Sequence, residues 1–372
     1  MDQLARIQPL IDRVLEHAQS PENQRRLNRQ PPFVEAWLEQ PTGAMSLFGT
    51  DVFRYFEDPL YHMEQGLLEK LWYFENYDDT KPIVPELPIW LGHYPDYTFL
   101  GMSVTWREDG VVQLQSDHPM TRQPDLSLLP RFSFTESGLM PQALRWYDTM
   151  DKAAAGRIKI GFINWGRGCL DLAVQLRGYE QLMMDAVERP EFVHGLMKFL
   201  VEERCRWYDE YYRYFGIPKG PISIADDWIN IPFISPAFYE EFLLPRYLEI
   251  EKHHGGVTGI HSCGNQGPIQ KFMLQIQSID SYEVSPWTSL EETLGNLPLS
   301  KFLRISMHPQ DVLLDTPEKL REKMAFIRDT CEPGREYSVG TSGIALRLDQ
   351  TPEAFIARIR MWTDLGYEVF GR

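Results

Sequence analysis

Residues 221–261 read PISIADDWINIPFISPAFYEEFLLPRYLEIEKHHGGVTGIH, and this segment predicts one strand–helix–strand unit. Residues 221–225 and 257–261 are short, mostly apolar and rich in β-branched side chains, as is typical of buried strands. Residues 235–254 have a helical pattern that begins with Ser235-Pro236, a capping residue followed by proline at the first helical position. Because a helix of this length connects the two strands, we expect the strands to lie parallel.

The same unit repeats along the C-terminal two thirds of the chain. Further β-rich segments lie at residues 158–163, 281–284, 302–307 and 337–340, and helical patterns lie at 181–215, 266–276, 288–294, 317–330 and 352–365. Six such strands, with one or two more from residues 80–115, indicate an α/β fold of the closed (β/α)8 type, a TIM barrel. An open doubly wound sheet is the alternative, although no glycine-rich turn marks a dinucleotide site after its first strand.

The N-terminal part of the chain has a different pattern. Residues 1–80 are mainly helical in pattern, so we expect an N-terminal helical extension packed on a barrel that comprises residues 81–372. Frequent proline and glycine interrupt residues 81–130, and the role of this stretch stays open.

Composition and charge argue against polyanionic partners. The 372 residues carry 37 Lys and Arg against 53 Asp and Glu, a net charge of −16, which disfavours nucleic acid and anionic membrane surfaces. Four scattered cysteines do not form a disulfide framework, and the N-terminus lacks the continuous apolar segment of a signal peptide. We therefore expect a cytoplasmic protein with a small-molecule ligand, no membrane partner, and a homodimer as one candidate assembly.

Polar and unusual residues follow the predicted strands at their carboxyl ends. In a barrel these ends and the loops after them form the working face. The candidates at this face are Asn164, Asp226, Asp227, Trp228, His261, Cys263, Glu283, His308 and Ser342. Their convergence on one rim predicts a binding pocket.

His261 and Cys263 form the most specific pair at this rim. Residues i and i+2 of an extended chain point to the same side, so the imidazole and the thiolate can reach one point. Nitrogen and sulfur donors together suit Zn²⁺, for which Glu283 and His308 are candidate third ligands. The alternative is a buried Cys beside a His that hydrogen-bonds a backbone carbonyl.

Asp226 and Asp227 are adjacent, so only one of them is expected to face the pocket. We favour Asp227 as a catalytic acid or base, with His308 as a second catalytic candidate. The alternatives are a carboxylate that hydrogen-bonds loop amides and a His308 that serves as a ligand or a structural cap. Trp228 is either a pocket wall or a core residue.

Several of these segments resemble one protein family. They are residues 224–228 (IADDW), 234–236 (ISP) with 244–247 (LPRY), 260–265 (IHSCGN), 340–343 (GTSG) and 350–353 (QTPE). Over residues 120–372 the chain resembles the uroporphyrinogen decarboxylase superfamily, and within it the corrinoid (cobalamin)-dependent methyltransferases. The resemblance implies a (β/α)8 barrel with an N-terminal helical extension.

Two branches of this superfamily differ in their site residues. The decarboxylases need an N-terminal stretch rich in Arg and Gly that ends in Pro-Glu-Tyr, which this chain lacks. The methyltransferases are similar to zinc enzymes with a His-x-Cys pair and a later Cys; His261 and Cys263 match the pair, and Ser342 stands where the later Cys is expected. This departure leaves open a methyl group taken from an O- or N-methyl donor.

The resemblance implies a metal-assisted methyltransferase. It would move a methyl group between a small O-, N- or S-methyl substrate and the cobalt of a separate corrinoid-binding protein. Zn²⁺ would be held by His261 and Cys263, and Asn164, Asp226, Trp228, Glu283 and Ser342 would contact the substrate. The alternatives are a metal-independent lyase similar to uroporphyrinogen decarboxylase and a non-catalytic binding protein of the same fold.

Overall fold

A computed structural model describes residues 3–38, 47–77, 80–107, 112–115, 118–331, 333–347 and 349–371. Its largest sheet has four parallel strands in the order β1, β10, β9, β8. These strands are β1 (Phe33–Glu35), β8 (Ser281–Val284), β9 (Phe302–Met307) and β10 (Tyr337–Thr341). The register places Val339 opposite both Val34 and Ile305, so apolar side chains of three neighbouring strands share one buried layer.

The remaining strands form pairs. β6 (Ile222–Ala225) is parallel to β7 (Val257–His261), β2 (Glu86–Pro88) is parallel to β5 (Lys159–Gly161), and β3 (Val104–Trp106) is antiparallel to β4 (Val112–Leu114). β7 lies against β8, and a parallel bridge from Arg167 to Ala225 connects the segment after β5 to β6. The α/β class with parallel strands is confirmed. Among the described residues, however, the pairings do not form one closed sheet.

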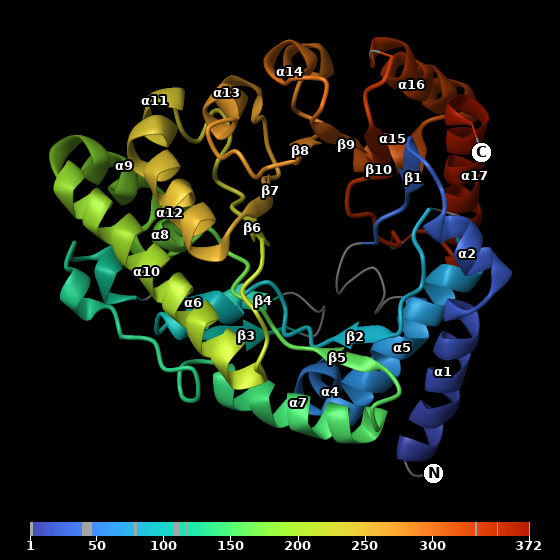
Figure 1. Cartoon of the computed structure of the whole chain (residues 1–372), viewed down its shortest axis with the longest axis horizontal. Helices are drawn as coiled ribbons and strands as arrows, with labels where there is room; N and C mark the ends of the chain where they lie inside the picture. The colour runs from blue at the N-terminus through green and yellow to red at the C-terminus, as the bar shows by residue number, and fades with distance from the viewer. Residues whose placement is uncertain are drawn as a thin grey trace.

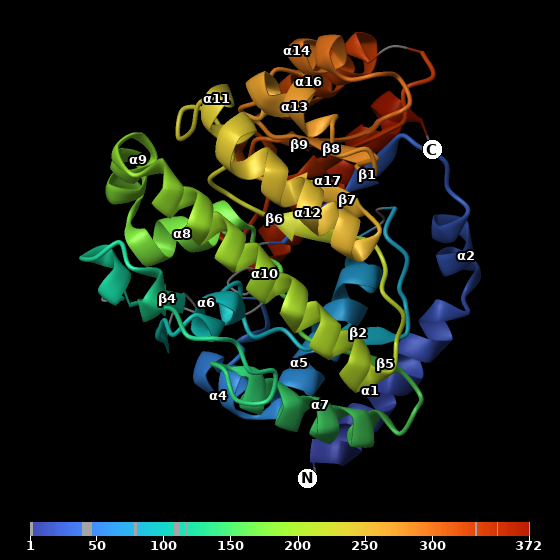
Figure 2. The same cartoon turned by 60° about the vertical axis from the view of Figure 1, so that its left-hand side comes forward.

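Helices surround the strands (Figure 1). The N-terminal half contains α1 (Gln3–Ala18), α2 (Pro21–Leu27), α4 (Val52–Glu57), α5 (Pro59–Asn76), α6 (Pro95–Phe99), α7 (Met140–Ala154), α8 (Cys169–Arg177) and α9 (Tyr179–Glu188). The C-terminal half contains α10 (Pro190–Phe215), α11 (Pro236–Phe238), α12 (Leu244–His254), α13 (Gln270–Met273), α14 (Leu290–Asn296), α15 (Pro309–Leu314), α16 (Pro317–Thr330) and α17 (Pro352–Phe370). The long helices α10 and α12 pack side by side (Figure 2).

Three predicted helix starts are confirmed by their caps. The side-chain oxygens of Ser235, Thr316 and Thr351 each accept a hydrogen bond from the backbone N–H three residues later, and a proline follows each of them. This arrangement satisfies an N–H group of the first helical turn that has no partner inside the helix.

Two helices that were expected to be continuous and regular are interrupted, and proline is the reason in both. The helix expected over residues 181–215 is divided into α9 and α10 at Arg189, because Pro190 disfavours the helical conformation of the residue before it. The helix expected over 235–254 contains a π-helical turn at Tyr239–Leu243 between α11 and α12. Pro245 lacks the N–H that would continue the regular ladder at this point.

The N-terminal segment supplies a strand as well as helices. β1 lies inside residues 1–80 and pairs with β10, and the backbone N–H of Thr80 donates to the Val34 carbonyl at 3.1 Å. α1 buries Ile7, Ile11 and Val14 against α5 and α7. The division of the chain at residue 80 stays a prediction. In the part of the chain that the structure describes, every helix is too short or too polar to cross a membrane.

Candidate functional site

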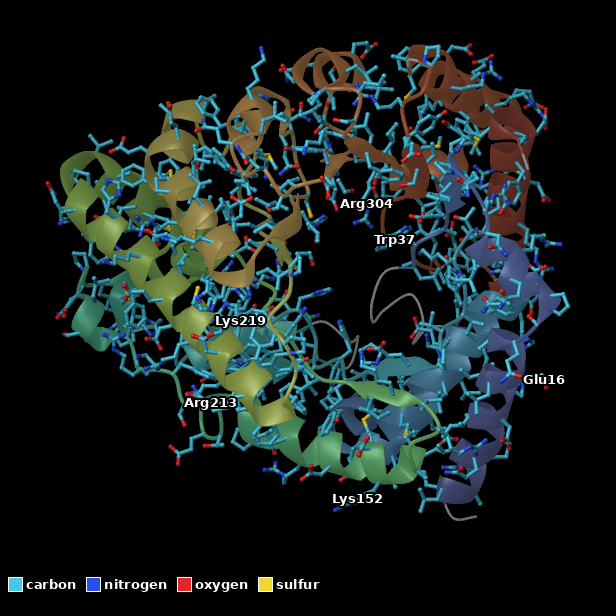
Figure 3. The ribbon with its side chains drawn as sticks, in the orientation of Figure 1. Glu16, Trp37, Lys152, Arg213, Lys219 and Arg304 are labelled. Atoms are coloured by element: carbon cyan, nitrogen blue, oxygen red, sulfur yellow. The ribbon has the colours of Figure 1, made fainter. Side chains whose placement is uncertain are left out.

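A cavity of about 400 Å³ lies among the parallel strands. Its wall includes strand residues of β6, β7, β8 and β9 and the segments that follow β2 and β5. Three predicted site residues line it, namely Asn164, His261 and Glu283. Arg304 of β9 also lines the cavity, and its side chain points toward the middle of the molecule together with Trp37 (Figure 3).

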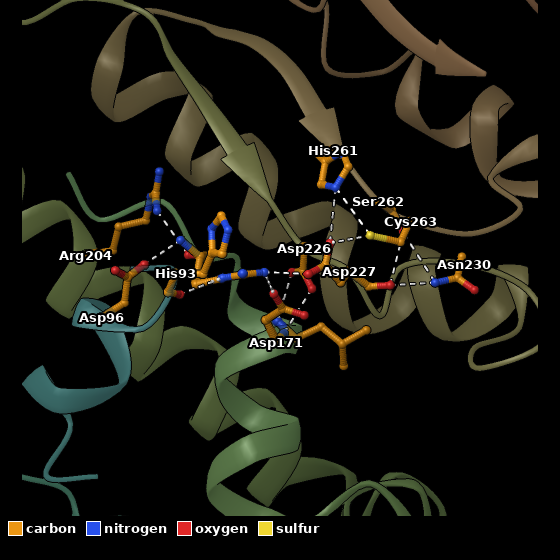
Figure 4. A network of polar contacts seen from close by, with 12 residues as sticks. His93, Asp96, Asp171, Arg204, Asp226, Asp227, Asn230, His261, Ser262 and Cys263 are labelled. Carbon is orange, nitrogen blue, oxygen red and sulfur yellow. Dashed lines mark hydrogen bonds and ion pairs between the residues drawn. The ribbon is translucent and has the colours of Figure 1, made fainter. Parts of the chain in front are cut away.

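Asp227, His261 and Cys263 bring three donor atoms together beside this cavity (Figure 4). Nε2 of His261 lies 3.3 Å from Oδ1 of Asp227 and 3.5 Å from Sγ of Cys263. Sγ of Cys263 lies 3.3 Å from the same Asp227 oxygen. The β6–β7 register explains this meeting, because Ala225 is paired with His261 and Asp227 follows two residues later.

The three donors have the spacing of a tetrahedral metal site. Bonds of about 2.1 Å to nitrogen and oxygen and about 2.3 Å to sulfur place tetrahedral ligands about 3.4–3.6 Å apart. The observed separations of 3.3, 3.3 and 3.5 Å agree with this arrangement. Asp227, His261 and Cys263 therefore fit Zn²⁺ with one position left for substrate or water.

Glu283 contacts the other nitrogen of the His261 ring. Its Oε2 lies 2.5 Å from Nδ1, and Arg304 Nη1 lies 3.9 Å from its second oxygen. A carboxylate on the outer nitrogen is the usual partner of a metal-binding imidazole, because it keeps the proton on Nδ1 and directs Nε2 inward. Glu283 thus serves in this geometry as a partner of His261, and Asp227 is the third donor.

Arg167 holds the carboxylate of Asp227. Its Nη1 lies 2.6 Å from Asp227 Oδ2 and 2.7 Å from Oδ2 of the buried Asp171. Arg167 also donates its backbone N–H to the buried Asp96. Asp227 therefore turns one oxygen to the guanidinium and the other to His261 and Cys263.

The electrostatics of the cluster favour positive charge. Burial acts to raise the pKa of Asp227, but the hydrogen bond from His261 and the charge of Arg167 hold that pKa well below its usual range. Burial acts to lower the pKa of His261, but its contacts with Asp227, Cys263 and Glu283 raise it to about 12. Two carboxylates thus stabilise a cation at the point where the three donors meet.

Asp226 has a different environment from its neighbour Asp227. It is completely buried, and its oxygens accept hydrogen bonds from the backbone N–H groups of Leu170 and Asp171 and from the Tyr247 hydroxyl. A Cβ on Gly168 would lie 2.1 Å from Asp226 Oδ2, which explains glycine at the start of α8. Asp226 anchors α8, whereas Asp227 contacts Arg167 and His261, which line the cavity, so the two carboxylates point to different sides as predicted.

Side-chain hydrogen bonds to the backbone fix the loop that carries Asp227. Nδ2 of Asn230 and Oγ of Ser262 both donate to the Asp227 carbonyl, at 2.6 and 3.1 Å. A Cβ on Gly264 would lie 2.2 Å from Cγ of Asn230, so a larger residue would displace this amide. The glycine after Cys263 therefore permits the close approach of the two loops.

Three predicted site residues lie apart from the donor cluster. His308 caps α15 through Nδ1, which accepts from Gln310 N, and it lines a different cavity. Trp228 stacks on Tyr179, and Ser342 donates to the Met307 carbonyl. The structure does not bring these side chains to His261, and their catalytic or substrate-binding roles stay predictions.

Arg167, Asp171 and Arg304 are site residues that sequence reasoning missed. Arg167 directly follows the strand-end segment that contains Asn164, so its position after β5 is the signal that could have found it. Arg304 alternates with buried Leu303 and Ile305 in β9 and thus faces the opposite side of the strand.

Comparison with known proteins finds similarity at the level of structure. The sequence matches no family model and no curated protein. The fold is similar to the solved structure of a methyltransferase from Methanosarcina mazei, with a TM-score of 0.66 and 15% sequence identity over 96% of this chain and 98% of that chain. This likeness is one of fold.

Proposed function

We propose that this protein is a metal-assisted methyltransferase that exchanges a methyl group between a small substrate and the cobalt of a corrinoid held by a separate protein. The observation that carries the proposal is the meeting of Asp227 Oδ1, His261 Nε2 and Cys263 Sγ at tetrahedral spacing beside a cavity of about 400 Å³. The fold likeness to a methyltransferase and the sequence resemblance to corrinoid-dependent enzymes support it. We also propose that the parallel strands form one (β/α)8 barrel around this cavity.

The roles of the chain's own residues follow from their contacts. Asp227, His261 and Cys263 would hold Zn²⁺, which supplies Lewis acidity to the heteroatom that carries the methyl group. Glu283 keeps the proton on His261 Nδ1, and Arg167 fixes the orientation of Asp227. Asn164 lines the cavity and offers a neutral amide to the substrate.

The proposed reaction would transfer the methyl group without its bonding electrons. In demethylation the heteroatom would keep the electron pair of its broken bond to the methyl carbon and take a proton from solvent. The Co(I) of the partner's corrinoid would supply the electron pair of the new bond to that carbon. The cavity walls would position the substrate for transfer to the cobalt, and such positioning would supply much of the rate.

Metal analysis tests the proposal. Purified protein should contain one zinc per Asp227–His261–Cys263 cluster, and His261→Ala, Cys263→Ser and Asp227→Ala should each lose it. A purified corrinoid protein incubated with the chain and a set of O-, N- and S-methyl compounds should become methylated by wild type alone. Unchanged metal content and activity in all three variants would contradict the proposal, and activity that survives chelation without a corrinoid partner would favour the lyase.

A further inference from the structure

A second cluster of cysteine and histidine lies between α10 and α12. Cys205 belongs to α10, and His253 and His254 are the last two residues of α12. One donor atom from each of these three residues lies within 4.8 Å of the other two. The whole of β7 follows this cluster in the chain before His261 is reached, so the two clusters lie at opposite ends of that strand.

His254 has a nitrogen that lacks a partner. The residue is 3% exposed, and Nδ1 lies 3.3 Å from the Tyr212 hydroxyl. Nε2 is buried and makes no hydrogen bond within the described residues. With the ring proton on Nδ1, toward the Tyr212 hydroxyl, Nε2 presents a lone pair to a ligand. A buried polar atom without a partner calls for an explanation, and a bound ion or water molecule is one.

His253 has an outer partner of the kind that metal-binding histidines use. Its Nε2 lies 3.1 Å from Asp209 Oδ1, one helical turn beyond Cys205 on α10. Its other ring nitrogen makes no hydrogen bond to the described residues. Lys219 Nζ lies 2.5 Å from Asp209 Oδ1, whose charge it balances, and 3.3 Å from the same Nε2 of His253.

We propose that Cys205, His253 and Nε2 of His254 bind Zn²⁺ as a second metal site, separate from the cavity. Two imidazole nitrogens and one thiolate form a ligand set that suits zinc, and a water molecule completes the tetrahedron. Burial raises the pKa of the Cys205 thiol to about 11, so metal binding releases its proton to solvent. The bound ion joins the C-terminus of α12 to the middle of α10.

Cobalt(II) spectroscopy in a Cys263→Ser background tests this site. This background removes the thiolate of the first cluster, so a thiolate-to-cobalt absorption band in chelator-treated protein reports Cys205. We expect the band in Cys263→Ser protein, its loss in Cys263→Ser/Cys205→Ser, and its retention in the matched control Cys263→Ser/Cys331→Ser. Identical spectra with and without Cys205 would overturn the proposal.

Zinc affinity gives a second readout that does not require substitution of Cys205. In the same background, Asp209→Asn should weaken zinc binding about 10-fold because His253 loses its outer carboxylate, and His253→Gln should weaken it further. Unaltered affinity in both variants would contradict the site. The result is independent of methyl transfer, because the first cluster is disabled throughout.

Discussion

Oε2 of Glu283 lies 2.5 Å from Nδ1 of His261, across the neighbouring strands β8 and β7. With Nδ1 in this contact, Nε2 of His261 points toward Asp227 and Cys263. We expect Glu283→Ala to reduce zinc affinity about 10- to 100-fold, because the ring loses the partner that sets its tautomer and orientation. Competition with a chromophoric chelator measures this change. The exposed Glu291→Ala is the control, and equal affinities of the two variants would contradict the role of Glu283.

Arg167 neutralises two carboxylates at once, and one of them belongs to the buried Asp171. We expect Arg167→Met to lower the free energy of unfolding by about 3 kcal/mol, because it leaves that carboxylate without its charge partner. Urea unfolding measures the effect. Addition of Asp171→Asn should restore part of the loss, and a double variant as unstable as the sum of the two single variants would argue against this coupling.

Substitution of the two adjacent aspartates should affect different properties, stability for Asp226 and metal binding for Asp227. Asp226→Ala leaves two buried N–H groups of α8 and the Tyr247 hydroxyl without their acceptor, so we expect a stability loss of about 2–3 kcal/mol. Asp227→Ala should instead lose the metal with a smaller change in stability. Thermal unfolding and metal analysis of both variants distinguish the roles, and a zinc content of Asp227→Ala protein equal to that of wild type would refute this assignment.

His62 should make stability depend on pH. Burial lowers its pKa to about 4, against about 6.5 in the unfolded chain. Between these values the unfolded chain binds a proton that the folded chain does not, so stability is full above pH 6.5 and decreases by up to about 3 kcal/mol as pH falls toward 4. His254 contributes in the same direction.

The His62 contribution can be isolated by His62→Gln. The glutamine oxygen can still accept the hydrogen bond that the Trp90 backbone N–H donates to Nε2 of His62. Urea unfolding from pH 7 to pH 4 should show a shallower decrease for this variant than for wild type. The partly exposed His194→Gln is the control, and parallel pH profiles for wild type and His62→Gln would exclude His62 as the source.

Local sequence predicted the C-terminal strands closely. β7, β8 and β9 have the predicted bounds, because each is a short apolar run between polar or glycine-containing segments. β1 was not predicted, since Phe33–Glu35 is only three residues long and gains its hydrogen bonds from β10, 305 residues further along the chain. A strand of this length has too little local pattern to be recognised before its partner is known.

The part of the site that is built from residues close together in the sequence was predictable. The spacing of His261 and Cys263 brings an imidazole and a thiol to one side of the chain, and the structure has their donor atoms 3.5 Å apart. Glu283 was expected as a third ligand, but its place on β8 brings it to Nδ1, the outer nitrogen of the ring. The contact of Arg167 with Asp227 spans 60 residues and has no local signal.

The sequence by itself determined the alternation of strands and helices, the spacing of the His-x-Cys pair and the expectation that Asp226 and Asp227 point to different sides, because periodicity and strand alternation act over a few residues. Only the tertiary structure decided that Asp227 completes the donor cluster, that Glu283 and Arg167 orient it, and that His308 lies elsewhere. These relationships depend on strand register, which decides the residues of the neighbouring strands that each side-chain atom meets. Register is set by the packing of the whole sheet, and no short segment contains that information.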